Sequence, residues 1–267
     1  MKRLIGVGMG PGDPELVTVK AVRVLREADV VLVPVLADTN GQVTPEQGRA
    51  ETVVRASVDG AKIRRVPFAL NDAGGVTTRR TGAWDRAAAV VASAFAEGAT
   101  TLAFGTIGDP NVYSTFSYLA QSVRGLVPDV IVETVPGITA MQDLAARSGT
   151  VLAEGSESLV LLPLTAGAAA LAAALAGRDT VVGYKLGTAA GPDADAVCAL
   201  LAEAGRLDGA VFGARLGLPG QDIRPAKELA DVAAVPYLST LVVPGKRDGR
   251  GSKLRAARTV DGGGGAP

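Results

Sequence analysis

The sequence contains no histidine and a single cysteine, Cys198, among its 267 residues. One cysteine excludes an internal disulfide framework and any zinc site built mainly from cysteines. The absence of histidine removes the side chain most often used as a metal ligand and as an acid or base near neutral pH. The chemistry of this protein therefore proceeds without imidazole, and we expect no metal site.

A surplus of one charge is also missing, since 27 Lys and Arg residues balance 27 Asp and Glu residues. Proteins that bind nucleic acids or anionic membrane surfaces usually carry a positive excess, so we expect neither partner. A hydrophobic leader is missing as well, because only a few apolar residues separate Met1 from the glycines that begin at Gly6. That run is too short for a secretory signal, and we expect a cytoplasmic protein.

The longest uncharged stretch covers residues 158–177 and is the one candidate membrane span. It is mostly alanine, and Pro163 and Gly167 divide it into two short runs, which favours a buried strand followed by a helix. Beyond residue 246 the sequence is rich in glycine and charge, and we expect a disordered tail over 246–267.

Short apolar runs alternate with longer helical patterns through the chain, which predicts an α/β protein with a largely parallel sheet. The predicted strands are 4–7, 30–33, 62–67, 101–104 and 130–135 in the first half, and 159–162, 180–184, 210–213 and 237–243 in the second. The predicted helices are 14–27, 83–96, 139–147, 168–176, 193–204 and 226–231. The turn at Val135 and Pro136 is the best candidate boundary, dividing the chain into domains 1–135 and 136–245.

The first predicted strand runs into a glycine-rich turn from Gly6 to Asp13. The dinucleotide fingerprint G-x-G-x-x-G fails here, because Pro11 or Asp13 stands where the last glycine is required, and no Walker lysine follows. The Asp13 carboxylate occupies the helix N-terminus where a phosphate would bind, and Pro11 and Pro14 remove two N–H donors. This loop favours an uncharged or cationic ligand, or it is only a tight turn.

Two further loops follow apolar strands: residues 105–115, which repeat the Gly-Asp-Pro arrangement at Gly108 to Pro110, and residues 135–140. The carboxyl ends of parallel strands share one edge of a sheet, where open α/β sheets bind ligands. We therefore expect the first two loops to meet in one crevice. The third element combines a Pro-Gly turn with Thr139 as a helix N-cap, and alone it predicts only a turn.

In this order and spacing, the three elements resemble the tetrapyrrole methylases, a family that uses S-adenosylmethionine (SAM), over about residues 3–245. The family motif G-x-G-x-G-P-G-D is matched by Gly6 to Asp13, G-D-P by Gly108 to Pro110, and V-P-G-[IV]-[ST] by Val135 to Thr139. Within the family, the runs 108–118, 152–155 and 184–187 are similar to the branch that methylates C20 of precorrin-2. One departure is Ile107, which stands where a second glycine is commoner.

The resemblance implies two α/β domains of the tetrapyrrole methylase type, SAM in the cleft between them, and a homodimer. Carried over by motif, the expected SAM contacts are Pro11, Ile107, Gly108, Asp109, Val112, Thr139, Ala140, Lys185, Leu186 and Leu216. The expected tetrapyrrole contacts are Tyr113, Ser114, Thr115 and Arg215, of which the first three can equally begin a helix.

The resemblance also implies an acceptor with several carboxylates, which calls for Arg and Lys at the site. The candidates are Arg64, Arg65, Arg79, Arg80, Lys185 and Arg215, each of which can also be an ordinary surface charge. Methyl transfer from a sulfonium needs alignment more than a nucleophilic side chain. Asp109, Asp72 and Tyr113 are conceivable acceptors for a proton leaving C20, and we assign none.

Several alternatives stay open. The substrate can be the cobalt form of precorrin-2, another corrinoid intermediate, uroporphyrinogen, or a protein side chain as in diphthamide synthesis. A nicotinamide-dependent oxidoreductase is disfavoured by the missing third glycine and by Asp13. A catalytically silent tetrapyrrole-binding protein is the third class.

Overall fold

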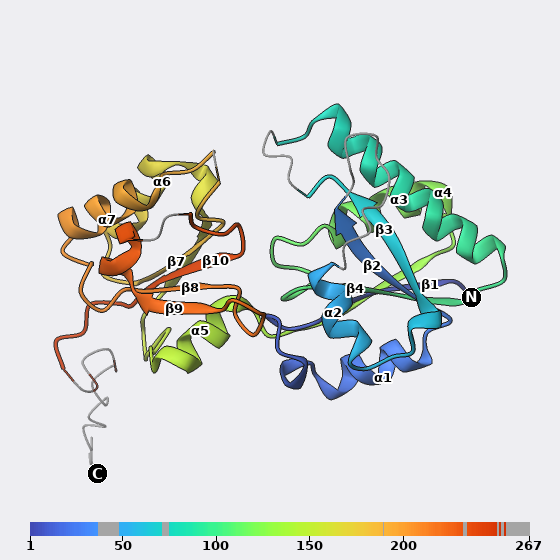
Figure 1. The fold of residues 1–267 in the computed structure, drawn as a ribbon, viewed down its shortest axis with the longest axis horizontal. Coiled ribbons are helices and arrows are strands. Elements are labelled where there is room, and N and C mark those ends of the chain that lie inside the picture. Colours follow the sequence, from blue (N-terminus) through green and yellow to red (C-terminus); the bar gives the residue numbers. More distant parts are fainter. Residues whose placement is uncertain are drawn as a thin grey trace, which may run out of the picture.

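The computed structural model describes residues 1–36, 48–70, 75–188, 190–231, 234–249, 251 and 254. Its core consists of two separate five-stranded sheets that lie side by side, each with helices packed on it (Figure 1). The α/β class predicted from the alternation of strands and helices is confirmed. Among the described residues, no helix is both long and apolar enough to cross a membrane.

The first sheet is entirely parallel and has the order β3-β2-β4-β1-β5. Its strands are β1 (Arg3–Gly8), β2 (Val30–Leu36), β3 (Ile63–Phe68), β4 (Thr101–Thr106) and β5 (Ile131–Val135). The two central strands β1 and β4 are apolar and buried on both faces, as expected when helices cover both sides of a parallel sheet.

Four helices cover the first sheet: α1 (Val19–Glu27), α2 (Arg49–Arg55), α3 (Thr78–Ala96) and α4 (Phe116–Leu126). Alternate residues of a strand point to opposite faces. Leu4 and Phe104 accordingly join the core cluster formed with α3 and α4. Ile5 and Ala103 join the cluster formed with α1 and α2. The sheet is thus the middle of three layers.

The predicted helix 14–27 is wrong as one element. Asp13 caps a short 3-10 turn at Pro14–Leu16, its Oδ1 accepting the Glu15 N–H at 2.9 Å, and the chain is extended at Val17. Thr18 then caps α1 by accepting the Ala21 N–H at 3.1 Å. Two capping side chains five residues apart in this short segment start two helical pieces instead of one.

The second sheet has the order β6-β7-β10-β8-β9. Its strands are β6 (Leu159–Pro163), β7 (Thr180–Tyr184), β8 (Val211–Ala214), β9 (Asp222–Pro225) and β10 (Ser239–Val243). Leu171 of α6 (Ala168–Leu175) and Val197 of α7 (Ala194–Glu203) share a core cluster with one face of the sheet. Leu144 of α5 (Ala140–Ser148) packs with Val182 and Val242 on the other face.

This second sheet departs from the predicted parallel arrangement, because only β6 and β7 run parallel. Strand β10 is antiparallel to β7 and β8, and β9 is antiparallel to β8. The link between β8 and β9 is too short for the helical crossover that a parallel pair needs, so these strands form a hairpin. The predicted helix 226–231 is a 3-10 helix in the structure.

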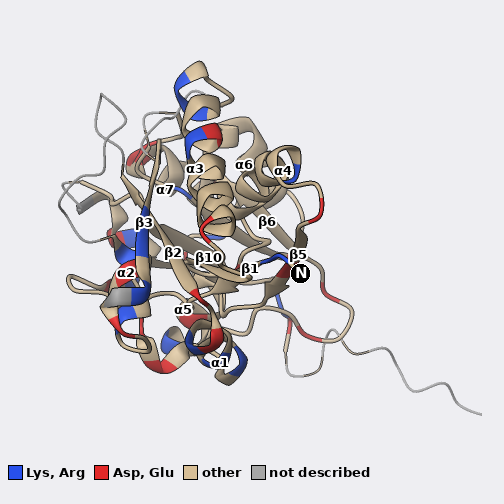
Figure 2. Ribbon diagram, turned by 90° about the vertical axis from the view of Figure 1, so that its right-hand side faces the viewer, with Lys and Arg blue, Asp and Glu red and all other residues tan. Residues whose placement is uncertain are grey.

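The predicted tail 246–267 falls mostly outside the described residues. Its first residues contact the unit built on the second sheet. The Lys246 Nζ donates to the Ala204 carbonyl at 3.0 Å, and Arg247 pairs with Glu157 at 2.6 Å. Acidic and basic residues are interspersed along α1, α2 and α3 (Figure 2), so in that view the neutral balance reflects local mixing of charges.

Candidate functional site

Three glycine-rich loops lie together because they follow three adjacent strands, β4, β1 and β5. Gly8 of β1 is in register with Thr106 of β4, and Val7 is in register with Val135 of β5, so the three strands end at one level. The expected meeting of the first two loops at the carboxyl edge of the sheet is confirmed, and the third joins them. We call residues 9–13, 107–113 and 136–140 the loop wall.

One glycine from each loop forms a backbone-to-backbone junction. A Cβ built on Gly137 would lie 2.2 Å from the Gly108 carbonyl oxygen and 2.8 Å from the Gly8 Cα. A Cβ on Gly8 would lie 2.5 Å from the Gly137 nitrogen. Gly108 itself has a φ of 72°, a region that favours glycine. Close packing of main chains therefore requires glycine at Gly8 and Gly137, whereas the backbone conformation favours glycine at Gly108.

Hydrogen bonds fix the three loops to one another. The Gly108 N–H donates to the Gly10 carbonyl at 2.7 Å. The Asp109 carboxylate accepts the Gly137 N–H at 3.0 Å through Oδ2 and the Asn111 N–H at 2.8 Å through Oδ1. Since both oxygens of Asp109 are engaged, its role in the structure is to position the second and third loops.

A second set of segments faces the loop wall from the second sheet, at the ends of three adjacent strands. Residues 184–186 end or follow β7, residues 215–217 follow β8, and residues 237–240 lead into β10. Because β10 is antiparallel, its beginning lies at the same edge as the ends of β7 and β8. We call these three segments the strand-end wall.

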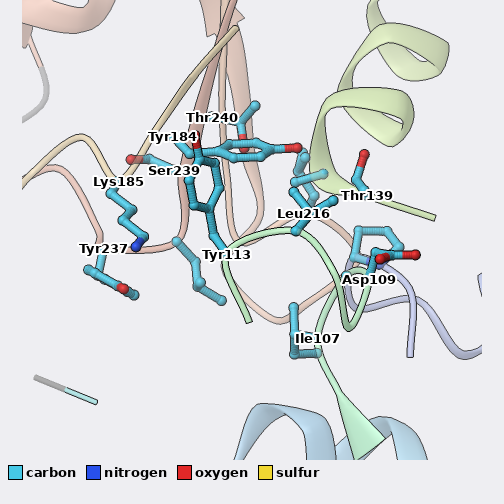
Figure 3. A pocket seen from close by; sticks show the side chains of 15 residues that line it. Ile107, Asp109, Tyr113, Thr139, Tyr184, Lys185, Leu216, Tyr237, Ser239 and Thr240 are labelled. Carbon is cyan, nitrogen blue, oxygen red and sulfur yellow. The ribbon is translucent and has the colours of Figure 1, made fainter. Parts of the chain in front are cut away.

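The two walls border a cleft of about 150 Å³ that is open to solvent (Figure 3). The lining residues are Pro11, Ile107, Gly108, Asp109, Val112, Tyr113, Thr139, Ala140, Tyr184, Lys185, Leu216, Tyr237, Leu238, Ser239 and Thr240.

Ten of the residues singled out in the sequence lie along this one cleft: Pro11, Ile107, Gly108, Asp109, Val112, Tyr113, Thr139, Ala140, Lys185 and Leu216. Leu186 does not line it, since its side chain is buried in the core of the second sheet. Ser114 and Thr115 do not line it either; they lie directly before α4. There the Ser114 Oγ accepts the Phe116 N–H at 3.1 Å. Arg215 is exposed beside the lining residue Leu216.

Five lining residues were not singled out by the sequence: Tyr184, Tyr237, Leu238, Ser239 and Thr240. The Tyr184 hydroxyl accepts the Met141 N–H at 3.0 Å, which joins the end of β7 to the start of α5. The Ser239 Oγ donates to the Leu186 carbonyl at 2.9 Å. Of these five residues, only Tyr184 could have been suggested by the sequence, since it precedes Lys185 and an aromatic side chain with a polar tip suits a cleft.

The start of α5 presents main-chain donors to the cleft. Thr139 is its N-cap, and the Thr139 N–H donates to the Gln142 side chain at 2.8 Å. Ala140 is the first helical residue and lines the cleft, so its N–H has no partner within the helix. A helix N-terminus of this kind attracts an acceptor oxygen or an anionic group.

The pKa values of the titratable groups along the cleft are shifted in opposite directions for tyrosine and for lysine. Burial raises the pKa of Tyr113, Tyr184 and Tyr237, so these phenols stay protonated well beyond neutral pH. Burial, followed by the charge of Arg80, lowers the pKa of Lys185. The Lys185 ammonium lies 5.1 Å from the centre of the Tyr113 ring, a cation–π distance, and in Figure 3 it points toward Tyr237.

Two of the arginine candidates, Arg64 and Arg65, are held in ion pairs. Arg64 pairs with Glu97 at 3.0 Å, and Arg65 pairs at 2.8 Å with Glu51, a fully buried carboxylate on α2. Both are thus engaged in structural ion pairs away from the cleft lining. Of the proton-acceptor candidates, Asp72 falls outside the described residues and Tyr113 lies in the cleft. Among the described residues, no group of three or more His, Cys, Asp or Glu side chains is arranged to hold a metal ion.

The fold and the site place this protein in a general class, that of α/β proteins with two units and a cleft between the ends of their strands. A family model described as tetrapyrrole (corrin/porphyrin) methylases matches residues 3–231. This chain belongs to that family. The resemblance drawn from the three glycine motifs is therefore confirmed.

Named relatives agree with this assignment. The precorrin-2 C(20)-methyltransferase of Sinorhizobium sp is 35% identical over 250 residues, covering 92% of this chain and 96% of that protein. The cobalt-precorrin-2 C(20)-methyltransferase of Salmonella typhimurium is 32% identical over 244 residues, covering 90% and 95%. Among solved structures, the methyltransferase CobJ aligns with a TM-score of 0.64 at 20% identity, over 93% of this chain and 98% of that one. That likeness shows the shared fold.

Proposed function

We propose that this protein is a SAM-dependent methyltransferase that methylates C20 of precorrin-2, giving precorrin-3A, in cobalamin biosynthesis. The observation that carries the proposal is that the three family motifs converge on one cleft in a chain 35% identical, over nearly its whole length, to a relative of that name. Methylases of this family use SAM as the methyl donor.

The residues of the cleft fit SAM, which carries a sulfonium, an amino acid group and a nucleoside but no phosphate. The loop wall offers main-chain groups and apolar surface at Pro11, Ile107 and Val112. The Ala140 N–H at the start of α5 suits a carboxylate or hydroxyl oxygen. The Asp13 side chain is used by the 3-10 turn, consistent with a loop that does not receive phosphate.

From these positions we infer the SAM contacts to be Pro11, Ile107, Gly108, Asp109, Val112, Thr139, Ala140 and Leu216, together with the main chain at Lys185. A contact by Leu186 would have to use its main chain. Tyr113 is the acceptor-side residue that lines the cleft, and its ring stands edge-on to that of Tyr184 at 5.9 Å.

Bound SAM supplies a methyl group already activated by the sulfonium. The task of the protein is to hold donor and acceptor in line at about 3 to 3.5 Å, which the interlocked loop wall suits because its main chain has little freedom to move. This accounts for a chain without histidine. A proton leaving C20 has no assigned acceptor: both oxygens of Asp109 are engaged, Asp72 falls outside the described residues, and Tyr113 stays a candidate that lines the cleft.

The test is incubation of the purified protein with SAM and precorrin-2, with its cobalt form, or with uroporphyrinogen III, followed by mass spectrometry. One added methyl group on precorrin-2 or its cobalt form, with equimolar S-adenosylhomocysteine, supports the proposal. Methylation of uroporphyrinogen alone, or of none of the three, overturns it.

We further infer a cytoplasmic homodimer with domains 1–135 and 136–245. The family resemblance supports the dimer, and the passage of the chain from the first sheet to the second after β5 supports the division. Sedimentation equilibrium of the purified protein gives the mass of the particle, and a monomer over the working concentration range contradicts the dimer.

A further inference from the structure

Basic side chains from three separate elements gather near Tyr237 and Leu238 of the cleft lining, a place that we call the outer edge of the cleft. Arg49 is the first residue of α2, Lys185 follows β7, and Arg215 follows β8. Arg49 and Arg215 are exposed, and Lys185 is half-buried in the cleft lining. We call these three residues the cationic group.

All three residues of the cationic group lie near Tyr237. It lines the cleft next to Leu238, and the Leu238 carbonyl accepts the Arg215 N–H at 3.0 Å, which fixes Arg215 beside it. Arg49 feels the charge of Arg215 and the phenol of Tyr237. The Lys185 side chain points toward the same ring (Figure 3).

The main chain is held in an unfavourable conformation at this edge. Among the described residues, only three that are not glycine have a positive φ: Tyr113 at 48°, Lys185 at 63° and Arg215 at 50°. Such conformations persist only where the surroundings enforce them, and they concentrate at binding and catalytic sites. All three lie along or beside the one cleft, so the strain serves to present these particular side chains.

The charges of the cationic group are not balanced within the described residues. There, no carboxylate lies at ion-pair distance from Arg49, Lys185 or Arg215, whereas Arg64 and Arg65 each have one. Partial burial and the charge of Arg215 lower the pKa of Arg49, and burial with the charge of Arg80 lowers that of Lys185. Like charges that lie close to one another are relieved by an anion that binds among them.

We propose that Arg49, Lys185 and Arg215, with the Tyr237 hydroxyl, form a carboxylate-binding site that holds an acidic substituent of the acceptor at the outer edge of the cleft. The inference rests on the proposed function, because it takes the molecule held at the outer edge of the cleft to be the acceptor. Guanidinium groups suit this role since they bind carboxylates through two parallel hydrogen bonds.

The test uses uroporphyrin III, a stable fluorescent porphyrin with eight carboxylates, and S-adenosylhomocysteine as separate probes. Fluorescence titration gives the affinity for the first and calorimetry that for the second. We expect Arg49→Gln and Arg215→Gln each to weaken uroporphyrin binding about five- to tenfold, and Arg49→Glu to weaken it further. The affinity for S-adenosylhomocysteine should change less than about twofold.

Arg23→Gln is the matched control, since Arg23 is an exposed arginine on α1 that pairs with Glu27. It should leave both affinities unchanged. Because Arg49 and Arg215 are exposed, their variants should keep the melting temperature of the unaltered protein, which separates a binding defect from unfolding.

Two outcomes overturn the proposal: unchanged uroporphyrin binding in Arg49→Gln and Arg215→Gln, or an equal loss of affinity for S-adenosylhomocysteine. With precorrin-2 as substrate, a raised KM at unchanged kcat supports the site, whereas a lowered kcat at unchanged KM contradicts it. If the unaltered protein methylates precorrin-2 and the variants match it, this site fails and the proposed function stands. If uroporphyrin binding depends on the cationic group but precorrin-2 is not methylated, the proposed function fails and the site stands.

Discussion

The loop wall and the strand-end wall of the cleft are built in different ways. The loop wall is held together by main chain, with Gly108 and Gly137 of the wall and Gly8 at the end of β1 packed backbone against backbone. The strand-end wall is made of side chains, with Tyr184, Lys185 and residues 237–240 facing the cleft. One wall therefore depends on the absence of side chains and the other on their identity, and substitutions should affect the two differently.

The largest effect is expected from Gly137→Ala in the loop wall. The new methyl group would lie 2.2 Å from the Gly108 carbonyl oxygen, so the second and third loops must separate. Overpacking of this kind costs about 1–3 kcal/mol, and we expect the affinity for S-adenosylhomocysteine to fall about 30- to 100-fold by calorimetry.

Gly125→Ala is the matched control for that prediction. Gly125 lies in α4 with open space around its Cα, and alanine favours helix more than glycine does. Its affinity should stay unchanged while its melting temperature rises slightly. Equal losses in both variants would remove the special role given to the glycine junction.

The next effect is expected from Asp109→Ala, which removes the acceptor of the Gly137 and Asn111 N–H groups. Hydrogen bonds to a charged acceptor contribute about 1.5–3 kcal/mol, and at the lower end of that range, about 1.5–2 kcal/mol, S-adenosylhomocysteine should bind roughly ten- to thirtyfold more weakly. Asp129→Ala, at an exposed pair with Lys2, should change nothing. If Asp109→Ala keeps the affinity but abolishes turnover, Asp109 takes part in the chemistry and its positioning role is wrong.

Sequence and structure agree best on the loop wall. Main chains can approach this closely only at glycine, so the geometry leaves a pattern that is legible in the sequence at Gly8, Gly108 and Gly137. The first sheet was predictable for a related reason, since β1, β2 and β4 are short apolar runs buried on both faces.

The strand-end wall was predicted only in part, for a reason of topology. The strand 237–243 was expected, but a largely parallel sheet would place its first residues at the edge away from the cleft. Because β10 is antiparallel, residues 237–240 lie at the cleft instead. Helix α2 and strand β9, both short, were not expected, and a helix beginning near residues 113–115 was only one of two alternatives because that run was also assigned to the motif.

A smaller effect is expected from Tyr184→Phe, in the strand-end wall. Loss of the hydroxyl removes the acceptor of the Met141 N–H, which water at the open cleft can partly replace. The cost should be about 0.5–1 kcal/mol, or roughly a threefold loss of affinity for S-adenosylhomocysteine. A loss as large as that of Gly137→Ala would end the distinction between the two walls.

The smallest effect is a dependence on pH. Lys185 has a lowered pKa in the free protein, and a bound carboxylate would raise it. Uroporphyrin binding should therefore be tightest at pH values where Lys185 is charged. It should weaken about two- to threefold as the pH rises through the lowered pKa of Lys185 in the free protein. Lys185→Arg should bind without this change in affinity, because arginine stays charged throughout; a Lys185→Arg protein with the same pH profile would show that another group is responsible.

The central claim is methyl transfer to C20 of precorrin-2, and the most direct measurement is the position of the transferred carbon. The purified protein is incubated with precorrin-2, and in parallel with its cobalt form, in the presence of SAM that carries a ¹³C-labelled methyl group, and the products are examined by NMR. We predict a single labelled methyl group attached to the C20 carbon. A label at any other carbon of the macrocycle, or no label in either product, contradicts the account.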